Sequence, residues 1–122
     1  LESTRHFVNA ETITKMKDGV TIINCARGEL MNIPDMIRGI ETQKIGALAL
    51  DVFDKEDGIY HENRRDDILS NRDMAYLLQF PNVIMTQHMA FYTDAAVQSM
   101  VFCGIEGLCD FAKTGHTETE LV

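Results

Sequence analysis

Residues 45–51 read Ile-Gly-Ala-Leu-Ala-Leu-Asp, an apolar run that ends at a single carboxylate. A run that is apolar on both faces predicts a strand buried in a parallel sheet. Two shorter runs also have the composition of strands: Val-Thr-Ile-Ile-Asn at 20–24 and Val-Ile-Met-Thr at 83–86. The segments between these three runs therefore decide how the strands connect.

Helices are predicted on either side of the strands, at residues 10–16, from Asn32, at 74–80 and from Thr93 to about Lys113. Three of them begin at an asparagine or threonine (Asn9, Asn32 or Thr93) whose side chain can cap a helix. Strands that alternate with helices predict βαβ units, right-handed crossovers and a parallel sheet. We therefore predict an α/β fold that forms half of a doubly wound domain.

The segment between the second and third strands has a different character. From Asp51 to Asp73 there are eight acidic and four basic residues, so half of the net charge lies in this short stretch. A long polar excursion of this kind is typical of a surface or functional loop.

The overall composition is that of an ordinary globular chain. The 122 residues include 11 basic and 19 acidic side chains, a formal charge of −8, and 45% are hydrophobic. The length fits one domain. Net acidity argues against binding to a nucleic-acid backbone. Uninterrupted apolar runs stay far below the roughly 18 residues of a membrane span, so no membrane contact is predicted.

The cysteines and the N-terminal residues indicate the cellular compartment of the protein. The first residues, Leu-Glu-Ser-Thr-Arg-His, carry no signal region. An odd number of cysteines (Cys25, Cys103 and Cys109) without a paired framework suggests a reducing environment. No Cys/His spacing matches a zinc site, so no metal is predicted. We expect a cytoplasmic protein and, since the chain does not begin with Met, a fragment of a longer one.

One arginine, two carboxylates and one histidine follow the three predicted strands. Arg27 follows the first strand, Asp51 ends the second with Glu56 five residues on, and His88 follows the third. Ligands of open α/β sheets bind outside the carboxyl ends of the strands. Each residue alone is more often solvated or structural. Their convergence at three successive strand ends favours a functional site.

These residue types together suit one kind of chemistry. A guanidinium holds a carboxylate at two points and polarises a neighbouring carbonyl. An imidazole exchanges protons near neutral pH, and a carboxylate bonded to it fixes its tautomer and favours its protonated form. This set is suited to interconverting a 2-oxo acid and a 2-hydroxy acid. The hydride must come from a cofactor, because no side chain supplies one.

The same residues carry a family resemblance over about residues 4–113, nearly the whole chain. The order and spacing of four sequence blocks resemble those of the NAD-dependent D-2-hydroxyacid dehydrogenases. The acidic excursion at 57–73 and His-Met-Ala-Phe-Tyr-Thr at 88–93 are similar to the D-lactate and D-2-hydroxyisocaproate dehydrogenases. The four blocks are Asn-Ala-Glu-Thr-Ile-Thr-Lys-Met-Lys-Asp-Gly at 9–19, Ile-Ile-Asn-Cys-Ala-Arg-Gly at 22–28, Leu-Asp-Val-Phe-Asp-Lys-Glu at 50–56 and Pro-Asn-Val-Ile-Met-Thr-Gln-His at 81–88.

The resemblance implies a division of the chain between two domains. Residues 1–92 would be the C-terminal part of a Rossmann-type NAD-binding domain, with a doubly wound parallel sheet. Residues 93–122 would be a crossover helix and tail that return toward a substrate domain, which is mostly absent from these residues. The dinucleotide fingerprint Gly-x-Gly-x-x-Gly is also absent from the sequence. A homodimer is the family expectation for the full-length protein.

The resemblance also implies roles for individual residues. Arg27 would bind the substrate carboxylate and polarise the 2-oxo group, His88 would donate the proton in reduction, and Glu56 would pair with His88. Phe91 would lie against the substrate side chain. The residues implied to contact NAD are Thr4, Cys25, Ala26, Arg27, Asp51 and His88.

Two positions depart from the family pattern, and some alternatives stay open. Gln87 stands where the family commonly has proline, and Lys55 where glycine is common. The implied activity is reduction of a 2-oxo acid to a D-2-hydroxy acid, such as D-lactate or a branched-chain acid, with NADH. The alternatives are a hydroxypyruvate or phosphoglycerate type of dehydrogenase and a non-catalytic NAD-binding module. The choice between NAD and NADP stays open, because the deciding residue lies outside this sequence.

Overall fold

The computed structural model describes residues 2–54, 56 and 71–118. The chain divides into two units, residues 1–89 and 90–122. Most of the acidic excursion, at 57–70, lies outside the described residues, as does Lys55.

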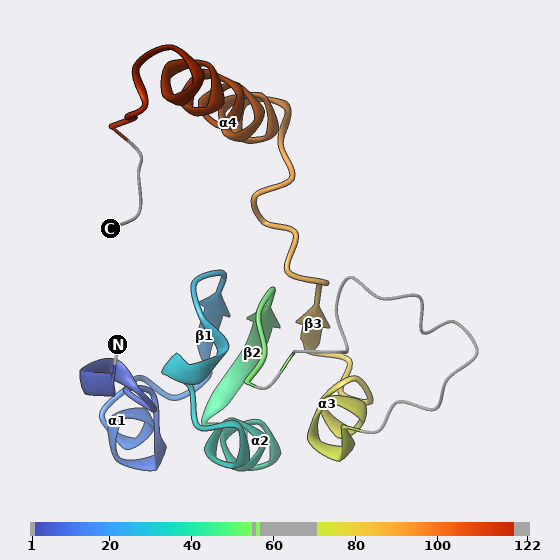
Figure 1. Cartoon of the computed structure of the whole chain (residues 1–122). Helices are drawn as coiled ribbons and strands as arrows, with labels where there is room; N and C mark the ends of the chain where they lie inside the picture. Colours follow the sequence, from blue (N-terminus) through green and yellow to red (C-terminus); the bar gives the residue numbers. More distant parts are fainter. Residues whose placement is uncertain (1, 55, 57–70, 119–122) are drawn as a thin grey trace. The chain divides into compact units, whose positions relative to one another are not determined.

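The first unit is built on three parallel strands in the order β1, β2, β3 (Figure 1). Their bounds are Val20–Asn24, Ile45–Leu50 and Val83–Met85. The register places Asn24 beside Leu50 and Leu50 beside Met85, so all three strands end at one level. The side chains that follow the strands are therefore brought to one edge of the sheet, as the sequence analysis predicted.

Three α-helices accompany these strands: α1 (Ala10–Thr14), α2 (Ile33–Glu41) and α3 (Arg72–Leu77). α2 packs on β2 and contacts both α1 and α3. Met36, Leu48 and Leu77 are among the fully buried side chains of the core between the helices and the sheet. Burial of side chains of this size stabilises the fold by about 1.5–3 kcal/mol each.

Within the described residues of the first unit, no element covers the other face of the sheet. Ile23, Ala49 and Ile84 form one row across the three strands, and Ile23 and Ile84 are 68% and 65% exposed. The run at 45–51 was predicted to be buried on both faces. β2 buries Ile45, Leu48 and Leu50 but exposes Gly46, so the prediction is correct for one face of the strand only.

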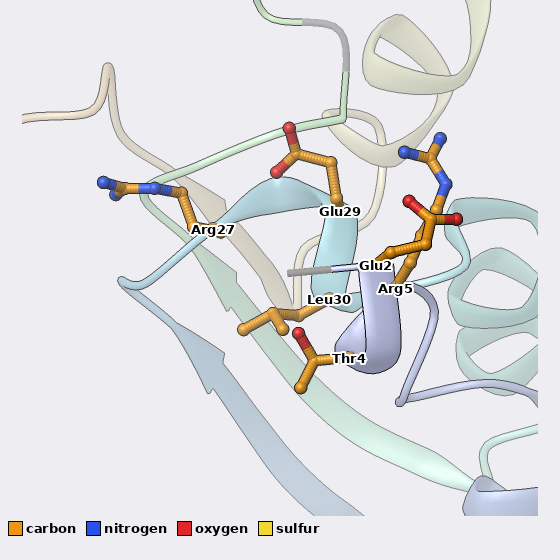
Figure 2. A pocket seen from close by; sticks show the side chains of 6 residues that line it. All are labelled: Glu2, Thr4, Arg5, Arg27, Glu29 and Leu30. Carbon is orange, nitrogen blue, oxygen red and sulfur yellow. The ribbon is translucent and has the colours of Figure 1, made fainter.

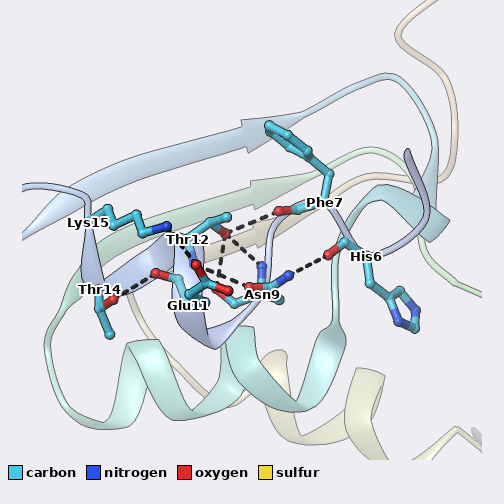
Figure 3. A network of polar contacts seen from close by, with 7 residues as sticks. All are labelled: His6, Phe7, Asn9, Glu11, Thr12, Thr14 and Lys15. Carbon is cyan, nitrogen blue, oxygen red and sulfur yellow. Dashed lines mark hydrogen bonds and ion pairs between the residues drawn. The ribbon is translucent and has the colours of Figure 1, made fainter. Parts of the chain in front are cut away.

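The amino-terminal segment is fixed by a reciprocal cap at the start of α1 (Figure 3). Asn9 accepts the N–H of Thr12 at 3.1 Å, and its own N–H donates to the Thr12 hydroxyl at 2.9 Å. The Asn9 amide also donates to the His6 carbonyl, and the Thr12 hydroxyl to the Phe7 carbonyl. The cap therefore holds the segment that precedes α1 as well as the helix itself.

We expect Asn9→Ala to lower the free energy of unfolding of the chain by about 1 kcal/mol, because the cap and the bond to His6 are both lost. Thermal unfolding followed by circular dichroism measures the effect. Asn9→Asp is the matched control, since it keeps the capping oxygen but loses the amide donor to His6. Equal stability of Asn9→Ala and the unmodified chain would contradict the role of this cap.

The predicted helix starts agree with the structure except at α3. Asn9, Asn32 and Thr93 each accept the main-chain N–H three residues on. α3 begins after Asn71, within the segment predicted to be a loop, and it ends earlier than predicted. The first residues of α3, Arg72 and Asp73, are polar and gave no helical periodicity.

The second unit consists of α4 (Asp94–Thr114) with its flanking residues. It ends at Gly115, whose φ of 73° is the left-handed conformation of a helix stop. Its large apolar side chains are exposed, among them Phe102 and Leu108. By length and mean hydropathy α4 also meets the criterion for a membrane span, although it contains no uninterrupted apolar run of that length.

Candidate active site

The turn after β1 is closed by Asn24, a residue that the sequence analysis placed only at the end of a strand. Its buried side chain donates to the Arg27 carbonyl at 2.9 Å and accepts the Ala26 N–H at 3.0 Å. The Asp51 N–H donates to the Asn24 carbonyl at 2.9 Å. Asn24 therefore fixes the turn that carries Arg27 and ties it to the exit of β2.

Gly28 lies where this turn meets the chain that leaves β2. A Cβ at this position would come closer than 3.0 Å to main-chain atoms of Phe53 and Asp54. Only a glycine lets these two segments lie so close together. The segment after Arg27 is thereby held against the segment that leads to Glu56.

Glu56 and His88 are 32 residues apart in the sequence and are hydrogen-bonded in the structure. Glu56 Oε1 lies 2.5 Å from His88 Nδ1, and Glu56 Oε2 accepts the N–H of Phe53 at 2.8 Å. Their side chains are 23% and 32% exposed, so the pair is only partly screened by solvent. A carboxylate on Nδ1 favours the tautomer with the proton on Nδ1 and assigns proton exchange to Nε2.

The backbone of His88 is left-handed, with φ of 51°. Residues other than glycine rarely adopt this conformation, although histidine is among those enriched there. The His88 N–H donates to the Asp51 carbonyl at 2.7 Å. The buried Asp51 carboxylate accepts the Thr86 hydroxyl at 2.5 Å and the Met89 N–H at 2.9 Å. The predicted contact of Asp51 with a cofactor stays a prediction.

Two neighbouring hollows lie at this edge of the sheet, and Arg5, Arg27 and Glu29 line both of them. One has a volume of about 410 Å³ and includes Glu56 and His88. The other, of about 480 Å³, includes Thr4 (Figure 2). Both have the size of small-molecule sites. Neither Arg5 nor Glu29 was predicted as a site residue, because an exposed charge outside a motif gives no signal in the sequence.

The Arg27 side chain is exposed at the rim of both hollows. Within the described residues its one hydrogen bond runs from Nη1 to the Ala26 carbonyl, at 2.8 Å. Figure 2 shows the Arg27 and Arg5 guanidinium groups on opposite sides of Glu29. A guanidinium has five N–H donors, so most of the donors of Arg27 remain available to a ligand.

The remaining predicted site residues are spread over both units. Cys25 and Ala26 are exposed in the turn before Arg27. Phe91 belongs to the second unit, where its ring packs edge-on against Tyr92 at a centroid distance of 6.1 Å. Its place against a substrate is therefore still a prediction. Among the described residues, no cluster of His, Cys, Asp and Glu side chains could hold a metal ion.

A parallel sheet with charged residues at its carboxyl edge defines an α/β domain with a ligand site at the ends of its strands. Residues 1–90 match the family model described as D-isomer specific 2-hydroxyacid dehydrogenase, NAD binding domain. The chain belongs to this family of NAD-dependent oxidoreductases, and the Rossmann-type fold predicted from the sequence is confirmed.

Individual relatives agree with this assignment. An aromatic 2-oxoacid reductase of Clostridium sporogenes is 41% identical over 117 residues, which are 96% of this chain and 35% of that protein. A D-lactate dehydrogenase of Lactiplantibacillus plantarum is 33% identical over 99% of this chain and 36% of its own length. The structure of a D-lactate dehydrogenase from Sporolactobacillus superposes with a TM-score of 0.94 at 29% identity, over 99% of this chain and 36% of that one. The chain thus spans about a third of the length of these relatives.

Proposed function

We propose that the protein that contains this chain reduces a 2-oxo acid to a D-2-hydroxy acid with NADH. One observation carries the proposal: the hydrogen-bonded pair of Glu56 and His88 lines the same hollow as Arg27. A proton donor beside a carboxylate-binding group is what this reduction requires. The family match supports the proposal independently of that geometry.

Arg27 is assigned to the substrate carboxylate. Its planar fork can donate two parallel hydrogen bonds to a carboxylate and can polarise the adjacent 2-oxo group. Glu29 lines the same rim and bears the opposite charge. A carboxylate substrate would therefore bind on the Arg27 side of the hollow rather than against Glu29.

His88 is assigned to proton transfer. With Nδ1 bonded to Glu56, Nε2 of the imidazolium gives a proton to the carbonyl oxygen of the substrate, which becomes the hydroxyl group. When bound, NADH would supply the hydride to the carbonyl carbon and would leave as NAD⁺. Glu56 orients the imidazole through Nδ1, and Phe53 fixes Glu56 through its N–H.

The residues present fit the nicotinamide end of NAD. Cys25, Ala26 and Arg27 are exposed in the turn after β1, and Arg27 lines a hollow that Thr4 also lines. Such groups suit a ring that bears a carboxamide. The sequence contains no Gly-x-Gly-x-x-Gly turn. We assign cofactor contacts to Thr4, His88, Asp51 and the turn at Cys25, Ala26 and Arg27, with Asp51 and the turn at the nicotinamide end.

The test is an assay of the protein encoded by the complete reading frame that contains these residues. NADH oxidation is measured with pyruvate, a branched-chain 2-oxo acid, phenylpyruvate and hydroxypyruvate. We expect turnover with pyruvate or the branched-chain acid, with phenylpyruvate as the competing substrate because one relative is an aromatic 2-oxoacid reductase. A preference for hydroxypyruvate would favour the other dehydrogenase type. NADH binding without turnover would indicate a non-catalytic module.

The organisation of the whole protein is part of the same proposal. Residues 1–92 would complete an NAD-binding domain whose other helices cover the row of Ile23, Ala49 and Ile84. Residues 93–122 would return to a substrate domain and bring Phe91 to the substrate, with the exposed side chains of α4 covered by protein. Dimerisation and a cytoplasmic location stay predictions, which size-exclusion chromatography and cell fractionation test.

We expect Arg27→Lys to raise the KM for the 2-oxo acid about tenfold to a hundredfold. An ammonium group cannot make the two-point contact, and hydrogen bonds to charged groups contribute about 1.5–3 kcal/mol. Steady-state kinetics with saturating NADH measure the change. Arg38→Lys is the control, because Arg38 is exposed on α2 and lines neither hollow. An unchanged KM in Arg27→Lys would leave Arg27 with a structural role only.

A further inference from the structure

We propose that Asp51 and Thr86 form a latch that holds the His88 backbone in the conformation needed for its bond to Glu56. The inference rests on the proposed function only where it assigns His88 to proton transfer. The latch itself is a property of the fold. Thr86 and Asp51 are thus positioning residues that act through His88.

Among the hydrogen bonds of the described residues, four join the loop after β3 to the end of β2. Two are main-chain bonds, from the N–H of Thr86 to the Leu50 carbonyl at 2.9 Å and from the N–H of His88 to the Asp51 carbonyl at 2.7 Å. The other two end on one carboxylate oxygen of Asp51, which accepts the Thr86 hydroxyl at 2.5 Å and the Met89 N–H at 2.9 Å. The four donors lie on both sides of His88 and at His88 itself, so the loop cannot turn about that residue without breaking one of them.

The burial of Asp51 makes this arrangement effective. Asp51 is only 4% exposed, whereas Thr86 and Met89 are exposed residues of the loop. Water therefore competes poorly for the carboxylate, and charge-assisted bonds of this kind are stronger than neutral ones. A carboxylate fixed by the sheet can then hold a loop that would otherwise be solvated.

The latch matters because of the backbone of His88. A φ of 51° is disfavoured for residues other than glycine and persists only where the surroundings impose it. The β3 loop carries Gln87 where the family resemblance leads one to expect proline, so the ring of a proline does not restrict it. The latch of Asp51 and Thr86 supplies the restriction and so directs Nδ1 to Glu56.

NMR spectroscopy of the complete protein that contains this chain tests the latch. Thr86→Val removes the hydroxyl and keeps the branched shape, while Thr86→Ser keeps the hydroxyl. We expect the Met89 amide to exchange with solvent about tenfold faster in Thr86→Val. The three-bond HN–Hα coupling of His88 and the ¹⁵N shift of Nδ1 should change in the same variant. Thr86→Ser should restore all three readouts toward those of the unmodified chain.

The control is Thr42→Val, which removes a hydroxyl bonded to the Arg38 carbonyl at the C-terminal end of α2. It should leave the His88 signals unchanged even if the chain is less stable. Unchanged His88 and Met89 signals in a folded Thr86→Val variant would overturn the proposal. The proposal would also be overturned if, in the unmodified chain, the Met89 amide exchanged its hydrogen with solvent as fast as an amide without a hydrogen bond.

Kinetics of the complete protein separate this proposal from the proposed function. Thr86→Val should lower kcat about tenfold while the KM for the 2-oxo acid stays nearly constant, since Arg27 is not touched. If the unmodified protein does not oxidise NADH, the proposed function fails, and the NMR result still decides the latch. If turnover is normal in Thr86→Val, the latch has no part in positioning His88 for proton transfer.

Discussion

His88→Gln is expected to lower kcat by a factor of about 10² to 10⁴ and to leave the affinity for NADH essentially unchanged. The amide of glutamine cannot transfer a proton at neutral pH, and general acid catalysis contributes a factor of this size. Steady-state NADH oxidation gives kcat, and quenching or enhancement of NADH fluorescence gives its dissociation constant. A parallel loss of turnover and NADH binding would contradict the assignment of His88 as proton donor.

The left-handed backbone of His88 must be separated from the chemistry of its ring. His6 provides a matched control, because it is also a histidine with positive φ, 52°, and it lines neither hollow. His6→Gln repeats the substitution and the backbone strain without removing the proposed donor. His88→Asn is the second comparison, since asparagine tolerates this conformation well. Low turnover in both His88 variants and normal turnover in His6→Gln would assign the effect to the imidazole.

Much of the architecture followed from local patterns in the sequence. The run at 45–51 predicted β2, and the capping asparagines predicted the starts of α1 and α2, because these signals depend only on neighbouring residues. The start of α3 was missed for the same reason. Its first turn, Arg72 and Asp73, is polar and adjoins an acidic segment, so no apolar period marked it.

For the site, the sequence predicted which residues lie together but not their individual hydrogen bonds. The rule that parallel strands end at one edge brought Arg27, Asp51 and His88 together in the prediction. The bond between Glu56 and His88 was implied by the family resemblance, since spacing alone cannot orient a side chain after a strand. The roles of Asn24 and Thr86 were missed, because both bind groups whose positions exist only in the folded chain.

The sequence also does not predict which segments cover each face of the sheet. An apolar strand pattern predicts that both faces of a parallel sheet are covered, but it does not say by which segment. In the described residues of the first unit the helices cover the face of Leu48, and the face of Ile23 and Ile84 is exposed. Since the chain spans about a third of its relatives, the uncovered face is consistent with a domain completed by other residues.

Gly28→Ala is expected to lower the free energy of unfolding by about 3 kcal/mol, the upper range for an overpacked site. The added methyl group would overlap main-chain atoms of Phe53 and Asp54, which cannot swing aside as a flexible side chain can. For a chain of this length the loss corresponds to a fall in Tm of roughly 12 °C. Thermal and urea unfolding of the 122-residue chain measure it.

Two other glycines separate steric overlap from backbone conformation. Gly19 has φ of 71° and no atom within 4 Å of an added Cβ, so Gly19→Ala should cost only about 1–2 kcal/mol. Gly104, inside α4, also has open space around it, and Gly104→Ala should raise helix stability by roughly 0.5–1 kcal/mol. The variants should therefore rank, from least to most stable, as Gly28→Ala, Gly19→Ala and Gly104→Ala.

Gly28→Ala also tests whether the close packing of these two segments positions the Glu56 side chain. Relief of the overlap at Gly28 requires the turn of Arg27 and the segment that leads to Glu56 to move apart. In a folded fraction of Gly28→Ala, the Nδ1 signal of His88 should therefore shift away from its value in the unmodified chain. Gly19→Ala should leave that signal unchanged, because Gly19 precedes β1 at the opposite end of the sheet. If Gly28→Ala is as stable as the unmodified chain and keeps the His88 signal, the close approach of these two segments does not position Glu56.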